Sequence, residues 1–145
     1  MKNGAWELTD LYPGAHVRVK VGSYYHHGIF IGNGEVVQFG LPFNVYGDPS
    51  EIRVLRSPLS DFCPSESSFI EVYRFSGKEK KQKASDDEIV RRALEAVGEG
   101  GYNVFTNNCE HFANYCVFGK KTSNQIDEVY RNVTEMLKKG SAPKN

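Results

Sequence analysis

The order of the predicted elements gives this chain an α+β fold, in which an antiparallel β-sheet packs against C-terminal helices. Short segments of alternating or β-branched residues fill the first half, and glycine-rich turns separate them. Apolar residues at helical spacing fill the second half. The expected strands cover residues 16–21, 24–31, 35–39, 51–55 and 68–75.

The helices are expected in the last part of the chain. Ser85 and Glu88 have the spacing of a capping box, which opens a first helix. Asn107 or Asn108 caps a second helix. A third helix carries an apolar stripe over 126–137, and this stripe suits packing against the core better than lying on a membrane.

One domain accounts for a chain of 145 residues. We expect residues 1–139 to form this single domain and 140–145 to be a disordered tail. The hydrophilic segment 76–85 contains four lysines and is interpreted as a solvated connector. Contact of these lysines with an anionic membrane surface is the alternative.

Composition narrows the function classes. The 18 basic and 18 acidic residues cancel, so the chain lacks the basic footprint that a nucleic-acid-binding protein needs. No apolar run is long enough to cross a bilayer, and the N-terminus lacks a signal-peptide core. The odd cysteine count, made up of Cys63, Cys109 and Cys116, argues against a disulfide framework. These features predict a reducing, cytoplasmic location.

Cys109 is the sharpest candidate for chemistry. It directly follows an asparagine cap, in the first turn of a predicted helix. A helix N-terminus lowers a thiol pKa and so favours the nucleophilic thiolate. The N–H groups of the same turn suit the oxyanion of an attacked carbonyl. The alternative is a buried structural cysteine, which is a common fate for this residue type.

A nucleophilic cysteine needs a base within hydrogen-bond reach. His111 lies two positions further along the same helix and points elsewhere, so it is expected to pack or hydrogen-bond within the fold. His16 begins a strand beside a turn and is expected at the surface. His26 and His27 are adjacent on one strand and face opposite sides of the sheet, so only one of them can face the Cys109 helix.

A family resemblance decides between them. The strand pair 25–39, followed about 70 residues later by Asn108-Cys109-Glu110-His111-Phe112, resembles the lecithin:retinol acyltransferase-like family of permuted papain-like cysteine hydrolases. The resemblance implies Cys109 as nucleophile and His26 as base. Gln38 occupies the position of the family's second histidine. A glutamine oxygen can also accept the hydrogen bond that fixes the tautomer of the base, so Gln38 is expected to orient His26.

This role for Gln38 depends on the register of one hairpin. A two-residue turn at Asn33-Gly34 pairs Ile29 with Gln38 and turns Gln38 away from His26. A three-residue loop, or a bulge of equal effect, pairs Gly28 with Gln38 instead. His26 and Gln38 then become diagonal neighbours on one face. The orienting role therefore predicts the longer loop or the bulge.

The resemblance implies cysteine-dependent acyl transfer or hydrolysis through a thioester, of the phospholipase A or acyltransferase type, without cofactor or metal. A phospholipid or other acyl ester is the implied substrate, and peripheral contact with a membrane is compatible with it. Two alternatives use the same fold. One is a cysteine peptidase or amidase, and the other is a non-catalytic interaction domain.

Overall fold

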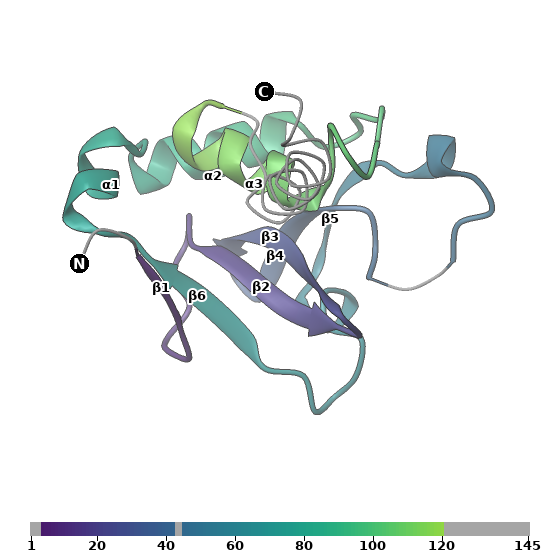
Figure 1. Cartoon of the computed structure of the whole chain (residues 1–145), viewed down its shortest axis with the longest axis horizontal. Helices are drawn as coiled ribbons and strands as arrows, with labels where there is room; N and C mark the ends of the chain where they lie inside the picture. Colours follow the sequence, from purple (N-terminus) through teal and green to yellow (C-terminus); the bar gives the residue numbers. More distant parts are fainter. Residues whose placement is uncertain (1–3, 43–44, 121–145) are drawn as a thin grey trace, which may run out of the picture.

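The computed structural model describes residues 4–42 and 45–120. Six antiparallel strands form one sheet in the order β1-β6-β2-β3-β4-β5, and helices cover one of its faces (Figure 1). The strands are β1 (Ala5–Glu7), β2 (His16–Val21), β3 (Tyr24–Gly32), β4 (Glu35–Phe39), β5 (Val54–Pro58) and β6 (Ile70–Arg74). The predicted α+β class, with its antiparallel sheet, is confirmed. The permuted papain-like core stays a prediction.

The main differences from the predicted strands lie at the edges of the sheet. β1 was not expected, because three residues show too little alternation to predict a strand. β5 begins at Val54 rather than at residue 51, since Asp48 caps a 3-10 turn over Pro49–Glu51, and the Asp48 side chain accepts a hydrogen bond from the Ser50 backbone. The strands at the centre of the sheet, β2 to β4, follow the predicted ranges closely.

Three α-helices follow, α1 (Gly77–Gln82), α2 (Asp86–Glu95) and α3 (Cys109–Phe118). The expectation of a connector over 76–85 was wrong for α1, because Ser76 and Glu79 form a reciprocal capping box that stabilises this short helix. The predicted caps of the other two are confirmed, with Ser85 opening α2 and Asn108 opening α3. The third predicted helix and the tail lie outside the described residues.

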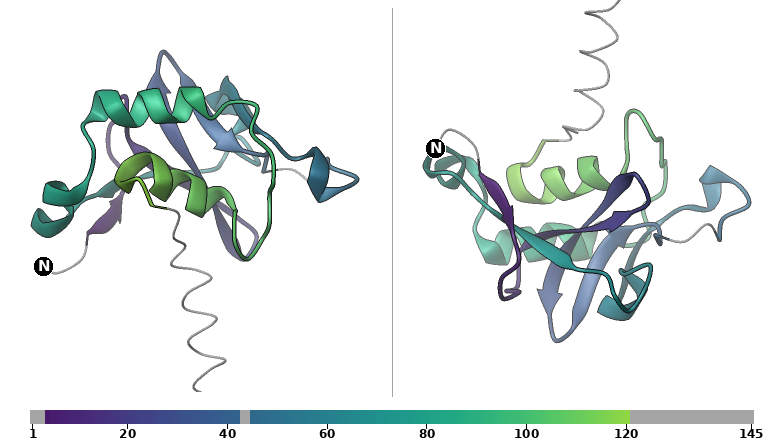
Figure 2. Two further views of the ribbon diagram at one scale, coloured as in Figure 1. Left: turned by 90° about the horizontal axis from the view of Figure 1, so that it is seen from above. Right: turned by 60° about the horizontal axis from the view of Figure 1, so that its bottom comes forward.

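Both faces of the sheet are buried, but by different parts of the chain. α2 and α3 pack on the face that carries Ile29, Val37 and Phe39, and Figure 2 shows these helices together on that side. The segment around Phe62 covers the opposite face, where Val17 and Val36 form a second cluster. A strand such as β3 therefore buries both its odd-numbered and its even-numbered side chains.

The hairpin between β3 and β4 contains the predicted bulge. Gly32 pairs with Glu35 around a two-residue turn, whereas Phe30 pairs with Val36, so Ile31 is an extra residue on β3. The bulge shifts the register by one residue and pairs Gly28 with Gln38, as the orienting role requires.

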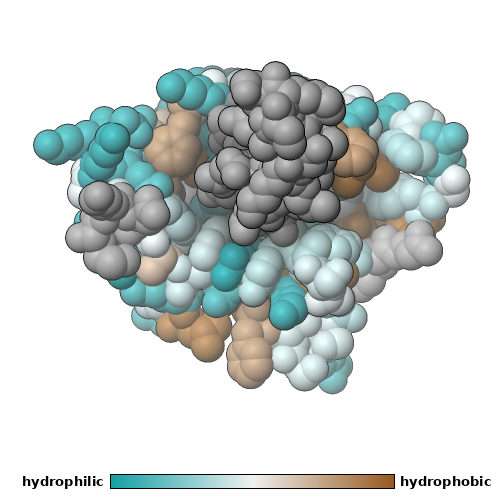
Figure 3. Space-filling model, viewed as in Figure 1, coloured by the Kyte–Doolittle hydropathy of each residue, from teal (hydrophilic) through white to brown (hydrophobic). Residues whose placement is uncertain are grey.

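Hydrophobic side chains also reach the surface. Among the described residues, the exposed large ones are Leu8, Tyr24, Val45, Phe69, Leu94, Val97, Val104 and Phe105. Figure 3 shows some of the hydrophobic surface at the right-hand end, where Figure 1 places the loops before β5 and before α3. No helix over 4–42 and 45–120 has the length and apolar character needed to cross a membrane.

Candidate active site

Cys109 is the first residue of α3, and the preceding cap fixes its position. The Asn108 side-chain oxygen accepts hydrogen bonds from the N–H groups of Glu110 and His111, at 3.0 and 3.1 Å. The His111 ring completes the capping box, because its Nδ1 accepts from the Asn108 N–H at 3.0 Å. His111 therefore stabilises the helix start, which confirms the expectation that it hydrogen-bonds within the fold.

Burial dominates the electrostatics of the Cys109 thiol. It raises the pKa of Cys109 to about 11, and hydrogen bonding from the backbone N–H groups of His27, Glu110 and Cys109 itself opposes the rise. The expectation that the helix N-terminus lowers this pKa was therefore wrong in its net direction. The helix acts as expected, but the cost of burying a thiolate outweighs it. In the free protein, sulfur holds its proton at neutral pH.

His26 lies on β3 and is bound to Gln38 of β4. The His26 Nε2 and the Gln38 Oε1 are 2.7 Å apart, and both side chains are buried. On its other side, the Gln38 amide donates to the Ser57 hydroxyl at 2.7 Å and to the Asp61 carbonyl at 3.3 Å. The Gln38 side chain thus connects the histidine to β5 and to the segment that covers this face of the sheet.

These contacts determine which nitrogen of His26 carries the proton. A backbone carbonyl can only accept, so the Asp61 carbonyl must face the NH2 group of Gln38. The amide oxygen then faces His26, whose Nε2 has to be the donor. Burial lowers the pKa of His26 to about 4, against the opposing effect of the bonds to Gln38 and to the Gly40 backbone. The ring is therefore neutral at pH 7.

His26 and Cys109 belong to opposite faces of the sheet. The His26 ring packs against Phe62, with ring centroids 5.2 Å apart, on the face away from α3. The residue that faces the helix layer is His27, whose Nε2 lies 3.9 Å from the Glu110 carboxylate of α3. Only one of the two histidines faces the Cys109 helix, as expected, and it is not His26. β4 nevertheless ends at Phe39, where Gly40 adopts a φ of 83° and its N–H bonds to Arg53. The first residues of β3 therefore have no β4 partner. The side chains of His26 and Cys109 both reach this open edge of β3.

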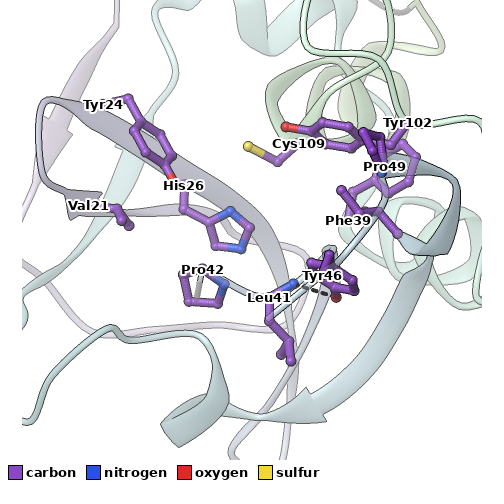
Figure 4. A pocket seen from close by; sticks show the side chains of 12 residues that line it. Val21, Tyr24, His26, Phe39, Leu41, Pro42, Tyr46, Pro49, Tyr102 and Cys109 are labelled. Carbon is purple, nitrogen blue, oxygen red and sulfur yellow. Dashed lines mark hydrogen bonds between the residues drawn. The ribbon is translucent and has the colours of Figure 1, made fainter. Parts of the chain in front are cut away.

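The open edge of β3 is the floor of a pocket of about 490 Å³, which both His26 and Cys109 line. Figure 4 shows the His26 ring and the Cys109 side chain entering this space from β3 and from the start of α3. Apolar and aromatic residues form most of the wall. They are Val21, Tyr24, Phe39, Leu41, Pro42, Tyr46, Pro49, Ile52 and Tyr102.

Two tyrosines of this wall were not predicted from the sequence. Burial, followed by the charges that Cys109 and Tyr24 carry when ionised, raises the pKa of Tyr102 to about 12. Burial and then Cys109 also raise the pKa of Tyr24. Both phenols therefore stay neutral hydrogen-bond donors beside the sulfur. For Tyr24, the available signal was its position two residues before His26, on the same side of the strand.

The other two strand histidines, His16 and His27, form a pair on the helix side of β3. The His16 Nε2 and the His27 Nδ1 are 2.9 Å apart, and the Trp6 ring packs edge-on against both imidazoles. The His27 Nε2 lies 3.9 Å from the Glu110 carboxylate. Burial, followed by the charge of Arg18, lowers the pKa of His16 to about 3. The expectation of a surface position for His16 was wrong, because the helix layer and Trp6 cover the start of β2.

The remaining cysteines are not part of the pocket. Cys116, on α3, is fully buried in the core, and Cys63 is a half-buried free thiol. Within 4–42 and 45–120, no three side chains among His, Cys, Asp and Glu are grouped so that they could bind a metal ion.

Fold and site together define an α+β protein in which a cysteine and a histidine line one apolar pocket and a buried amide holds the histidine. A family model described as lecithin retinol acyltransferase matches residues 9–122, and the chain therefore belongs to this family of enzymes. Mouse lecithin retinol acyltransferase is 26% identical over 94% of this chain and 67% of its own length. Human phospholipase A and acyltransferase 3 is 30% identical over 84% of this chain and 80% of its own length. Human phospholipase A and acyltransferase 1 is 26% identical over 83% and 76%.

Proposed function

We propose that the protein transfers an acyl group from a carboxylic ester, of the phospholipid type, through a thioester on Cys109. The observation that carries this proposal is the hydrogen bond between Gln38 and the Nε2 of His26, because it leaves Nδ1 to act as the base in the pocket that Cys109 also lines. The proposal includes Gln38 as the residue that orients His26. It also includes residues 1–139 as the catalytic domain and a cytoplasmic location.

The first half-reaction begins with two neutral groups. Nδ1 of His26 takes the proton of the Cys109 thiol as sulfur attacks the ester carbonyl carbon. The carbonyl oxygen becomes an oxyanion, which the Cys109 N–H and the phenols of Tyr24 and Tyr102 stabilise. The carbon–oxygen bond of the ester then breaks. The leaving alkoxide takes the proton from His26, and the acyl group remains on sulfur as a thioester.

The second half-reaction reverses the roles. A hydroxyl, an amine or water enters the pocket and gives its proton to Nδ1 as it attacks the thioester carbonyl. The carbon–sulfur bond breaks, and sulfur recovers the proton from imidazolium. Gln38 has no charge to stabilise imidazolium, so its contribution is to fix the tautomer and the orientation of the ring.

The composition of the pocket favours an acyl chain over a peptide. All the residues that line it, the neutral His26 included, are uncharged at pH 7, and most of them are apolar or aromatic, which suits a hydrocarbon chain. A peptide would bring backbone N–H and carbonyl groups that need partners. The amidase alternative uses the same Cys109 and His26, and the test below separates it from the ester reaction.

Trapping the acyl-enzyme tests the proposal. We expect a phospholipid labelled on its acyl chain to label the protein, and neutral hydroxylamine to remove the label as it does from a thioester. Cys109→Ala should abolish labelling, whereas the matched control Cys63→Ala, which removes a more accessible thiol, should keep it. Labelling that persists in Cys109→Ala contradicts the proposal, and labelling by peptide probes alone favours the amidase.

A further inference from the structure

Two loops at the mouth of the pocket expose apolar side chains to water. Val104 and Phe105, exposed by 54% and 66%, lie between the pocket residues Tyr102 and Cys109. Val45, exposed by 60%, directly precedes the pocket residue Tyr46. With Tyr24, they make up four of the eight exposed large hydrophobic residues in the described part of the chain. Single exposed apolar residues are normal, but a group around one opening marks an interaction surface.

The loop before α3 is ordered, although its tip is apolar. Asn103 and Asn107 pair through two backbone hydrogen bonds of 2.9 and 2.8 Å, and the Asn103 side chain accepts from the N–H of Phe105 at 2.9 Å. The Val104 carbonyl accepts from the side chain of Asn108, the cap of the Cys109 helix, at 2.9 Å. The fold thus holds Val104 and Phe105 outward on a tip that is fixed to the nucleophile.

The apolar parts of these loops carry no charge, although Asp48, Glu51 and Arg53 follow in the loop before β5. The segment 100–108 has no Lys, Arg, Asp or Glu, and neither have the described residues 40–42 and 45–47. The basic segment around α1 lies at the other end of the molecule in both Figure 1 and Figure 2. An uncharged apolar surface binds a lipid layer by inserting its side chains, and not by attraction to anionic headgroups. Tyrosines at its border suit the boundary between lipid and water.

We propose that the rim formed by Tyr24, Val45, Val104 and Phe105 inserts into a lipid surface of zero net charge and brings the mouth of the pocket onto it. This inference rests on the proposed function for its choice of occupant, because the acyl ester in question resides in such a surface. An acyl chain could then pass from the lipid layer to Cys109 along the apolar wall without crossing water.

Flotation with phosphatidylcholine vesicles tests the rim. We expect the full chain to bind these vesicles equally at low and high salt, and Phe105→Ser to lower the partition coefficient about tenfold, since burial of a phenylalanine ring is lost. The matched control is Phe69→Ser. Phe69 is more exposed, at 73%, but lines a different pocket beside Leu8, so this variant should bind as the unchanged chain does.

Three binding results would overturn the proposed rim: no binding to phosphatidylcholine, binding that needs phosphatidylserine and disappears in salt, or an equal loss of binding in Phe69→Ser. A change in the oligomeric state of Phe105→Ser without vesicles would also overturn it, because a second copy of the chain would then cover the rim. Turnover of a water-soluble ester is measured separately. If the unchanged chain binds vesicles through Phe105 but has no such turnover, the rim stands and the proposed acyl chemistry fails.

Discussion

His26 and His27 are neighbours on β3, and both are buried, but they have opposite surroundings. His26 borders an open pocket and bonds to an amide whose orientation is fixed by its other partners. His27 is enclosed by His16 and Trp6 on the helix side. Burial keeps both rings neutral at pH 7. Access to the pocket and a fixed tautomer therefore distinguish a candidate base from a structural histidine, whereas burial and pKa do not.

Alanine at position 26 should lower activity, whereas alanine at position 27 should lower stability. We expect His26→Ala to lower kcat/KM for a soluble ester by about 10³-fold, because a positioned base contributes about 10² to 10⁴. His27→Ala should keep kcat/KM within about tenfold but lower the free energy of unfolding by about 2–3 kcal/mol, since it leaves a cavity in a packed cluster. Steady-state kinetics and denaturant unfolding measure the two effects. Equal losses of activity would remove the distinction.

Gln38→Leu should have the next largest effect. Leucine keeps the bulk but leaves the Nε2 of His26 without its acceptor, so we expect a fall in kcat/KM of about 10²-fold. Gln38→Glu adds a readout that a structural role would not change. Its carboxylate favours imidazolium, so the acid limb of the pH–rate profile should move up from about pH 4. An unmoved limb would contradict direct contact in the working enzyme.

The free energy of unfolding should depend on pH through His16 and His26, which lie on opposite faces of the sheet. The folded pKa of His16 is about 3 and that of His26 about 4, against 6.5 for the ordinary side chain. Between these values the unfolded chain binds protons that the folded chain does not. The stabilisation is thus fully present above pH 6.5 and is lost as pH falls toward 4 and 3, by about 1.4 kcal/mol per pH unit for each histidine.

His16→Phe separates the two contributions. It should flatten the decline in unfolding free energy below pH 6.5 by the share of one histidine, as followed by denaturant unfolding at several pH values. The acid limb of kcat/KM should stay near pH 4, because it belongs to His26. A limb that moves with His16 would show that the two sides of β3 are coupled.

Ser57→Ala should have the smallest effect. Gln38 loses one acceptor of its NH2 group but keeps the Asp61 carbonyl. One neutral hydrogen bond is worth about 1 kcal/mol, so kcat/KM should fall by about fivefold or less. The same kinetic assay measures it, and a loss as large as that of Gln38→Leu would mean that Ser57, rather than Asp61, fixes the amide.

The sequence predicted the parts of the site that depend on local pattern. The asparagine cap before Cys109 follows from a short-range rule and is observed. The hairpin register was open between two turns, and the orienting role of Gln38 required the bulge that the structure contains. The burial of His16 did not follow, because alternation predicts one covered face, whereas this sheet is covered on both. The raised pKa of Cys109 could not be predicted either, since burial comes from distant segments and outweighs the local helix.

The open edge of β3 was also beyond local pattern. Residues 35–39 read as a strand, but nothing in them shows that β4 ends at Phe39 and leaves the first residues of β3 without a β4 partner. Where a strand loses its partner depends on the path of the chain that follows, which a local pattern does not show. The unpaired start of β3 is also what allows side chains from two faces of one sheet to share a pocket.

The bulge at Ile31 makes the spacing of a turn as important to the site as the identity of its side chains. Strand residues alternate between even and odd sides, and one extra residue exchanges the two for all of β4. Deleting Ile31 would leave Cys109, His26 and Gln38 unchanged in the sequence, yet it would direct the glutamine into the helix layer. The number of residues between His26 and Gln38 is thus as necessary as the two residues themselves, and a variant with every candidate residue intact can still lack the site.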